Sequence, residues 1–335
     1  MGSYRFFLAI LVAISHAGIG FFGYNPGVVA VISFYILSGY VMSLLIVKYY
    51  AHPSAIPTFY LDRAARLFPQ FVFYMLLATI FIYFLKFDSQ LTNKPTINEW
   101  LLNLLILPLG FYMYWADGPL VIPQAWSPGL EMTFYLAIPW ILIFFSNRKI
   151  YTLACLSFLI FLTAYCGKIN SDIFGYRLLF GTLFMFLIGW SFSKNDSNSI
   201  KFRFIALLLA GALLLIAFFN NFIYQLPYNK EVLAGLIIGI PAINFIRHLN
   251  PSKIDEFLGN LSYGVFLNHF IIIWLMQKFL TVKSFDIGNI TILLASSCAL
   301  ALGSFLYIER PALKWRYTIR NGITQKRTNK RASQV

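Results

Sequence analysis

Ionisable side chains inside long apolar segments are the features of this sequence that could carry chemistry. The first pair is Arg5 and His16, which are separated by ten mostly apolar residues. On a helix the two lie roughly 16 Å apart, so His16 would lie near the middle of a bilayer core of about 30 Å if Arg5 marks one surface. A histidine at that depth is either a functional group or a neutral ring hydrogen-bonded within a helix bundle. This segment alone leaves both alternatives open.

Two arginines follow the second apolar segment. Arg63 and Arg66 are three residues apart, so on a helix they project from one face. Two guanidinium groups at a membrane surface can clamp a phosphate, because each offers a planar fork of donors. The competing explanation is that they set the topology and contact anionic lipid.

A carboxylate and a second histidine occur in later apolar segments. Glu131 follows shortly after the start of one segment, at a depth that can match that of His16. A carboxylate beside a histidine can orient the ring and stabilise its charged form, as a general base requires. The alternative is that Glu131 pairs with Arg177 or with a tyrosine hydroxyl inside the bundle. His269 lies at mid-depth of another segment, which makes a purely structural role for both histidines less plausible.

The composition indicates the class of protein that must position these residues. The chain has 335 residues, of which 59% are hydrophobic and 11% are charged, and its mean hydropathy is +0.71. These values exclude an ordinary soluble domain and favour a multi-pass membrane protein. The net charge of +14 falls in short loops and a tail, which favours topology signals and anionic lipid over nucleic acid as its cause. The cysteines show neither disulfide nor metal-ligand spacing, and we expect no metal.

Apolar periodicity and charge bias predict an all-α protein with ten transmembrane helices and both termini in the cytoplasm. An eleventh apolar segment, 98–114, is broken by Pro108 and Gly110. With ten spans, 19 of the 26 lysines and arginines lie inside, whereas eleven spans would leave only 9 inside. We therefore expect 98–114 to be an interfacial or re-entrant helix in the outer loop. The ten predicted spans are 5–22, 27–47, 70–86, 128–146, 150–167, 175–192, 202–219, 231–247, 260–280 and 289–308.

Five sequence elements, taken in this order, resemble the membrane-bound acyltransferase family 3, the O-acetyltransferases that modify bacterial surface glycans. They are the Arg5–His16 spacing, SFYILSGY, the pair Arg63 and Arg66 before Pro69, AWSPGLEMTFY, and LSYGVFLNH. The resemblance runs from about residue 4 to about residue 313. Two positions depart from the family pattern, Asp62 where a basic residue is frequent and Pro128 where leucine is usual.

The resemblance implies acetyl-CoA as a co-substrate on the cytoplasmic side and a glycan hydroxyl on the other side. Arg5, Arg63 and Arg66 would then hold the phosphates of CoA. His16 would deprotonate the acceptor or be acetylated itself, and Glu131 would orient it. Further residues of the matching elements would support the substrate or the structure, namely Tyr40, Trp126, Tyr263 and His269.

The expected organisation is a transmembrane acyltransferase domain at 1–313 and a basic cytoplasmic tail at 314–335, in the bacterial cytoplasmic (inner) membrane. The acceptor stays open among O-antigen, capsule or exopolysaccharide, and a lipid-linked sugar, and the acyl group could be larger than acetyl. The main alternative is a transporter or flippase that uses the histidines and the glutamate as a proton relay. The sequence shows neither the internal repeats nor the paired broken helices frequent in transporters.

Overall fold

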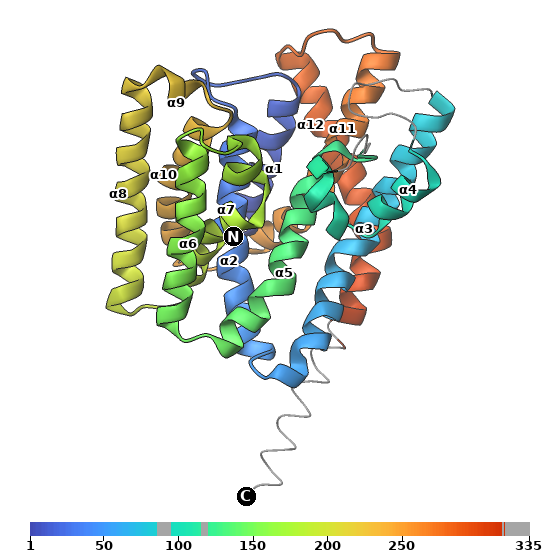
Figure 1. The fold of residues 1–335 in the computed structure, drawn as a ribbon. Coiled ribbons are helices and arrows are strands. Elements are labelled where there is room, and N and C mark those ends of the chain that lie inside the picture. The colour runs from blue at the N-terminus through green and yellow to red at the C-terminus, as the bar shows by residue number, and fades with distance from the viewer. Residues whose placement is uncertain (86–94, 115–119, 317, 319–335) are drawn as a thin grey trace, which may run out of the picture.

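The structure is a computed structural model that describes residues 1–85, 95–114, 120–316 and 318. These residues form a bundle of helices (Figure 1), and no strand is present among them beyond one isolated bridge between Phe21 and Tyr24. The prediction of an all-α protein is confirmed. The helices in chain order are α1 (Gly2–His16), α2 (Pro26–Tyr49), η1 (Pro53–Ala55), α3 (Ile56–Leu85), α4 (Ile97–Leu104), η2 (Leu107–Tyr114), η3 (Pro123–Ala125), α5 (Trp126–Phe144), α6 (Asn147–Tyr165), η4 (Ile173–Arg177), α7 (Leu179–Ser191), α8 (Ser197–Phe219), α9 (Asn221–Gln225), α10 (Asn229–Ile246), α11 (Lys253–Phe279), α12 (Ile287–Ser304) and η5 (Phe305–Glu309).

The described residues contain nine helices long and apolar enough to cross a membrane, together with the shorter apolar helix α1. These ten elements follow the ten predicted spans in order, and the prediction of a polytopic membrane protein is confirmed. The first predicted span, 5–22, is wrong at its end, because α1 stops at His16 and the chain turns through Gly18 with φ +87°. His16 is therefore the last residue of its helix. The number of crossings and their orientation stay predictions.

Helix α3 differs most from the predicted boundaries. It begins at Ile56 rather than near residue 70 and continues through Pro69 without ending. Arg63 and Arg66 are thus helical residues of one long element, as their spacing requires. Helix α11 also begins early, at Lys253, where the hydroxyl of Ser252 caps it by accepting a hydrogen bond from the amide of Asp255 (3.1 Å).

The segment 98–114 forms two short pieces instead of one span. Helix α4 has eight residues and starts with a capping box between Thr96 and Glu99. The left-handed residue Ile106 (φ +60°) follows, and then the 3₁₀ turn η2. At about 1.5 Å per residue, α4 is far too short for a bilayer, which agrees with the charge-bias prediction. Its interfacial placement stays a prediction.

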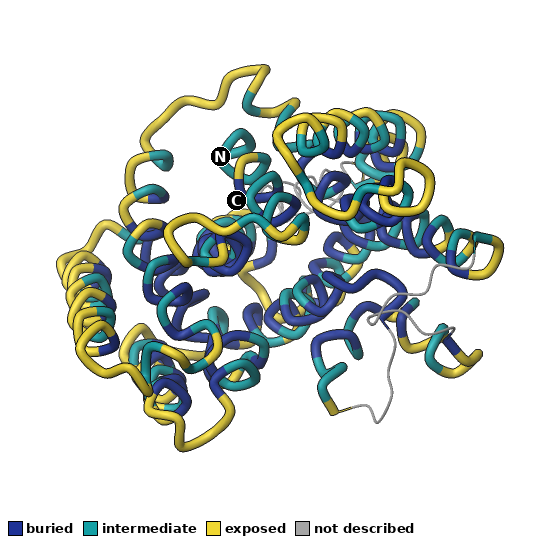
Figure 2. Tube along the Cα trace, turned by 90° about the horizontal axis from the view of Figure 1, so that it is seen from above, coloured by how far each residue is buried: buried dark blue, intermediate teal, exposed yellow. Residues whose placement is uncertain are grey.

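The core lies around α2 and α7. In the most apolar 18-residue stretch of each span, 72% of residues are buried for Ile173–Ser191 but only 17% for α8. Figure 2 shows this difference as dark blue inner helices and yellow outer faces. Close packing of α2 on α7 depends on two glycines, since a Cβ on Gly39 would meet the carbonyl of Phe186 and one on Gly189 would meet that of Ile36. The outward apolar residues of α8 suit contact with lipid.

Candidate active site

Two cavities lie inside the bundle. The larger one holds about 1670 Å³ of empty space, part of it open to solvent. Its walls come from the first turn of α1, the middle of α2, the first halves of α3 and α11 and the start of α5, together with residues from α7 and the segment after η5. The smaller one holds about 430 Å³ of empty space, again partly open, and its walls come from the last turn of α1, the first turns of α2, η3, η4, the start of α5 and Phe266 of α11. Helix α1 reaches both cavities, because Arg5 lines the larger and His16 lines the smaller.

Four guanidinium groups line the larger cavity, and three of them are paired. Arg63 binds the neighbouring Asp62, which is fully buried. Arg316 binds the other oxygen of the same carboxylate at 2.8 Å. Arg66 forms an ion pair with Glu309 and lies over the ring of Tyr263 at 5.6 Å.

The fourth guanidinium group belongs to Arg5. No carboxylate binds it among the residues that the structure describes, in contrast to Arg63, Arg66 and Arg316. The four arginines outnumber the two carboxylates that pair with them, but Glu131, Asp255 and Glu256 also line the cavity. The cavity as a whole therefore has no excess of positive charge, and it is the guanidinium donors that suit an anionic ligand with phosphate oxygens. The sequence departure at Asp62 is explained by this cluster, because its carboxylate joins Arg63 to Arg316.

Glu131 belongs to the larger cavity and not to the one that contains His16. Its Oε1 accepts hydrogen bonds from the hydroxyls of Ser38 (2.7 Å) and Tyr135 (2.6 Å). The predicted contact between Glu131 and His16 does not occur among the hydrogen bonds of the described residues. Equal depth in the membrane did not bring the two together, because they face different cavities.

The partner of His16 is instead His269, which lies on α11 and is fully buried. His16 Nδ1 is 2.9 Å from His269 Nε2, and the two ring planes are parallel within 4°. On the far side, His269 Nδ1 is 3.2 Å from the carbonyl oxygen of Val265.

These two contacts fix the tautomers of the neutral rings. The Val265 carbonyl can only accept, so His269 Nδ1 carries a proton and His269 Nε2 is an acceptor. His16 Nδ1 must then donate to it, which leaves His16 Nε2 without a proton. No described residue donates to that nitrogen. The arrangement is that of a base held in one orientation by a second ring.

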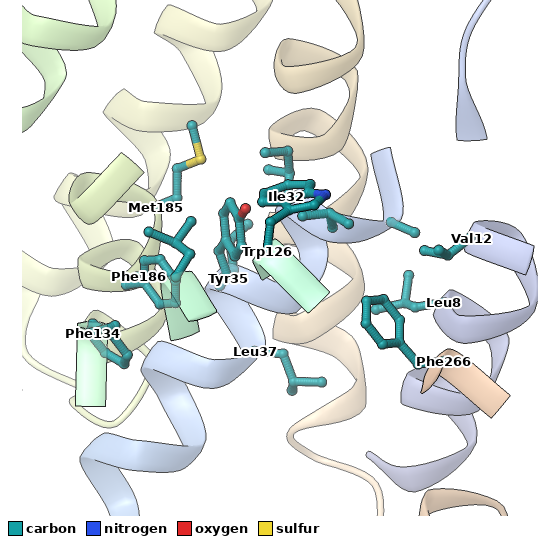
Figure 3. Packing of buried hydrophobic residues seen from close by; sticks show 14 of the residues in the cluster. Leu8, Val12, Ile32, Tyr35, Leu37, Trp126, Phe134, Met185, Phe186 and Phe266 are labelled. Atoms are coloured by element: carbon teal, nitrogen blue, oxygen red, sulfur yellow. The ribbon is translucent and has the colours of Figure 1, made fainter. Parts of the chain in front are cut away.

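Aromatic rings and one arginine line another part of the smaller cavity. Arg177 donates to Asp172 (2.5 Å), and its guanidinium lies 4.5 Å from the ring centroid of Trp126. Trp126 meets the ring of Tyr176 edge to face at 5.0 Å. Tyr35 of α2, labelled near Trp126 in the view of Figure 3, lines the larger cavity instead. Flat aromatic faces with a few fixed polar groups are typical of a small-molecule site.

Comparison with known families assigns the chain to one of them. The profile described as an acyltransferase domain matches residues 4–309. The chain belongs to the acyltransferase family. The resemblance inferred from the five sequence elements and the prediction of an enzyme are therefore confirmed.

Several curated proteins are similar to this acyltransferase. An uncharacterized protein of Aquifex aeolicus is 30% identical over 213 residues, which cover 62% of this chain and 92% of that protein. The peptidoglycan O-acetyltransferase OatA of Listeria monocytogenes is 24% identical over 344 residues, covering 92% of this chain and 54% of that protein. A putative O-acetyltransferase of Staphylococcus aureus, SACOL0978, is 23% identical over 333 residues, which cover 87% of this chain and 54% of that protein. The chain thus spans about half the length of these two O-acetyltransferases. No solved structure matches it.

The predicted supporting residues of the acyltransferase lie in different parts of the structure. Trp126 lines the smaller cavity and Tyr263 lines the larger. Tyr40 lines neither, and its ring packs edge to face on Phe192 at 6.4 Å. Sequence reasoning did not assign Arg177 to the site, although an arginine at the start of an apolar segment was a usable signal. Among the described residues, no group of three histidine, cysteine, aspartate or glutamate side chains could hold a metal ion.

Proposed function

We propose that this protein transfers an acetyl group from acetyl-CoA on the cytoplasmic side of a bacterial inner membrane to a hydroxyl of a glycan on the other side. The observation that carries the proposal is the division of the site. An arginine-lined cavity and an imidazole with an unprotonated nitrogen lie at opposite ends of one short helix, α1. The names of the Listeria and Staphylococcus relatives support O-acetyl transfer as the reaction.

The donor occupies the larger cavity in this proposal. It is several times larger than the cavity beside His16 (about 1670 against 430 Å³ of empty space, counting space open to solvent), and it suits a long cofactor such as CoA. Arg5, Arg63 and Arg66 bind the phosphates, and Arg5 contributes most because no carboxylate of the described residues competes for it. Glu131, fixed by Ser38 and Tyr135, belongs to this cavity and acts on the acyl end of the donor.

The acceptor hydroxyl lies in the smaller cavity, next to His16. Trp126 and Tyr176 offer flat faces to a sugar ring, and Arg177 offers donors to its oxygens. The acceptor class is therefore a carbohydrate. A peptidoglycan-type acceptor is suggested by the name of the Listeria relative, and O-antigen, capsule or exopolysaccharide, and lipid-linked sugars have the same hydroxyl chemistry.

The reaction exchanges a thioester for an ester. His16 Nε2 takes the proton of the acceptor hydroxyl, and the oxygen attacks the thioester carbonyl. The C–O bond forms, the C–S bond breaks, and the sulfur of CoA leaves as a thiolate that takes up a proton. His269 is a positioning residue, since it holds the proton on His16 Nδ1 and keeps Nε2 free. The same nitrogen could instead carry the acetyl group between donor and acceptor.

Topology supports this assignment of sides. The predicted cytoplasmic side holds 19 of 26 basic residues, including the three arginines proposed for CoA. We place the 1–313 region in the membrane as the catalytic domain. The basic region 314–335, which lies mostly outside the described residues, serves as a cytoplasmic contact to anionic lipid.

The test is acetyl transfer by membranes that contain the wild-type protein or His16→Ala at equal amounts. Surface glycans are analysed by mass spectrometry for the mass increase of one acetyl group. Loss of a general base lowers the rate by roughly 10²–10⁴-fold, and we expect a loss of that size. His52→Ala is the matched control, because His52 lies on an exposed turn and contacts Ser54. Undiminished transfer by His16→Ala would remove His16 from the reaction.

A further inference from the structure

Two side chains are common to the linings of the two cavities. Among the described residues, these are Ser127 and Phe266. Every arginine proposed to bind the donor lines the larger cavity, whereas His16 lines the smaller one. The two shared side chains therefore mark where the cavities meet, and we take this boundary as the passage for an acyl group that leaves the donor for a hydroxyl beside His16.

Phe266 is the larger of the two shared side chains, and its contacts fix its position. Its side chain is buried on α11, and its ring lies edge to face against Phe34 (6.1 Å) and against His269 (6.2 Å). The backbone is held as well, since Gln124 donates its side-chain amide to the carbonyl oxygens of Phe266 and Leu267, both at 2.9 Å. Figure 3 shows Phe266 reaching from α11 toward the face of α1 that carries Leu8 and Val12.

Ser127 is the smaller of the two shared side chains. It lies in the first turn of α5, next to Trp126 of the smaller cavity and four residues before Glu131 of the larger. Its hydroxyl makes no hydrogen bond to the residues that the structure describes. We expect a small polar side chain and a fixed aromatic ring at this boundary to leave room for a short acyl group, whereas a longer chain would have to displace the ring.

We infer that Phe266 is the residue that selects the length of the transferred acyl group. This inference rests on the proposed function, and it names the side chain that restricts the transfer reaction to short acyl groups. The passage can widen at Phe266 only if its well-packed ring gives up contacts with Phe34 and His269. Each added methylene in a closely fitting apolar site changes discrimination by roughly tenfold or more, so one ring can separate acetyl from butyryl.

The experiment compares acetyl-, propionyl- and butyryl-CoA as donors for the protein in membrane vesicles. Peptidoglycan fragments are the acceptor probe, and both released CoA thiol and acylated fragments are measured. For wild type we expect rates that fall steeply from acetyl to butyryl. In Phe266→Ala and the milder Phe266→Leu, the ratio of butyryl to acetyl transfer should rise by about tenfold or more. Phe266→Trp should lower acetyl transfer.

Phe161→Ala is the matched control, because Phe161 is a buried phenylalanine that lines neither cavity. It removes a ring of the same size elsewhere in the bundle, and its ratio should stay at the wild-type value. If both smaller variants are present at wild-type levels and keep the wild-type ratio, the inference is wrong. If wild-type protein releases no thiol and acylates no fragment with any of the three donors, the proposed function fails first.

Discussion

The two cavities differ in how their charged and polar groups are held. In the larger cavity, three arginines are paired with carboxylates, whereas Arg5 has no carboxylate partner among the described residues. In the smaller cavity, the central group is an imidazole whose hydrogen bonds run through a second imidazole to a backbone carbonyl. The first arrangement suits binding of a fixed anion, whereas the second suits movement of a proton.

The two cavities also separate Glu131 from His16. A carboxylate beside the histidine would stabilise its charged form strongly, whereas a neutral ring fixes the tautomer without adding charge. Glu131 lies with Ser38 and Tyr135 in the larger cavity. Variants that change one cavity and leave the other intact therefore test whether the two have separate roles.

The largest effect after His16 itself is expected at His269. His269→Leu removes the acceptor for His16 Nδ1 and frees the ring to rotate, and misplacement of a catalytic group by about 1 Å can cost roughly a hundredfold in rate. His269→Gln keeps an oxygen that can accept the same hydrogen bond and should recover part of the activity. Rates and their pH profiles should be measured for both variants. Equal losses and unchanged profiles in the two would show that His269 only fills space.

A smaller and more selective effect is expected at Arg5. Hydrogen bonds to charged groups contribute about 1.5–3 kcal/mol, so Arg5→Ala should raise the KM for acetyl-CoA by roughly tenfold or more while kcat changes less. Initial rates against acetyl-CoA concentration measure this. Arg310→Ala is the control, since Arg310 is exposed and lines neither cavity. An unchanged donor KM in Arg5→Ala would contradict the role of the larger cavity.

The smallest effect is expected at Tyr40. Its ring packs on Phe192, away from both cavities, and no described residue forms a hydrogen bond with its hydroxyl. Tyr40→Phe keeps this packing, so acyl transfer should stay within about twofold of wild type. A large loss would give Tyr40 a substrate role and would extend the site beyond the two cavities.

The sequence predicts much of the fold, because long apolar segments and charge bias are local signals. They indicated the order of the helices and the short, non-spanning segment at 98–114. They did not indicate that α1 ends at His16, since its apolar character continues past the turn at Gly18. They also missed the early start of α3, because its first turns carry the polar residues that line the donor cavity.

The sequence predicted which residue types form the site, but it predicted less well which of these residues contact each other. His16 and His269 are 253 positions apart, and Asp62 and Arg316 are 254 apart. Depth along a helix follows from residue number, but the direction in which a side chain points depends on how each helix is rotated in the bundle. Depth alone therefore suggested Glu131 as the partner of His16.

The central claim is that the donor binds in the arginine-lined cavity and presents its acyl group at the wall shared with His16. The most direct test is a structure of the His16→Ala variant with acetyl-CoA, determined by electron cryomicroscopy. We predict phosphate density within hydrogen-bond distance of Arg5 and the thioester between Ser127 and Phe266. Density for the nucleotide outside this cavity, with Arg5, Arg63 and Arg66 touching none of it, would contradict the claim.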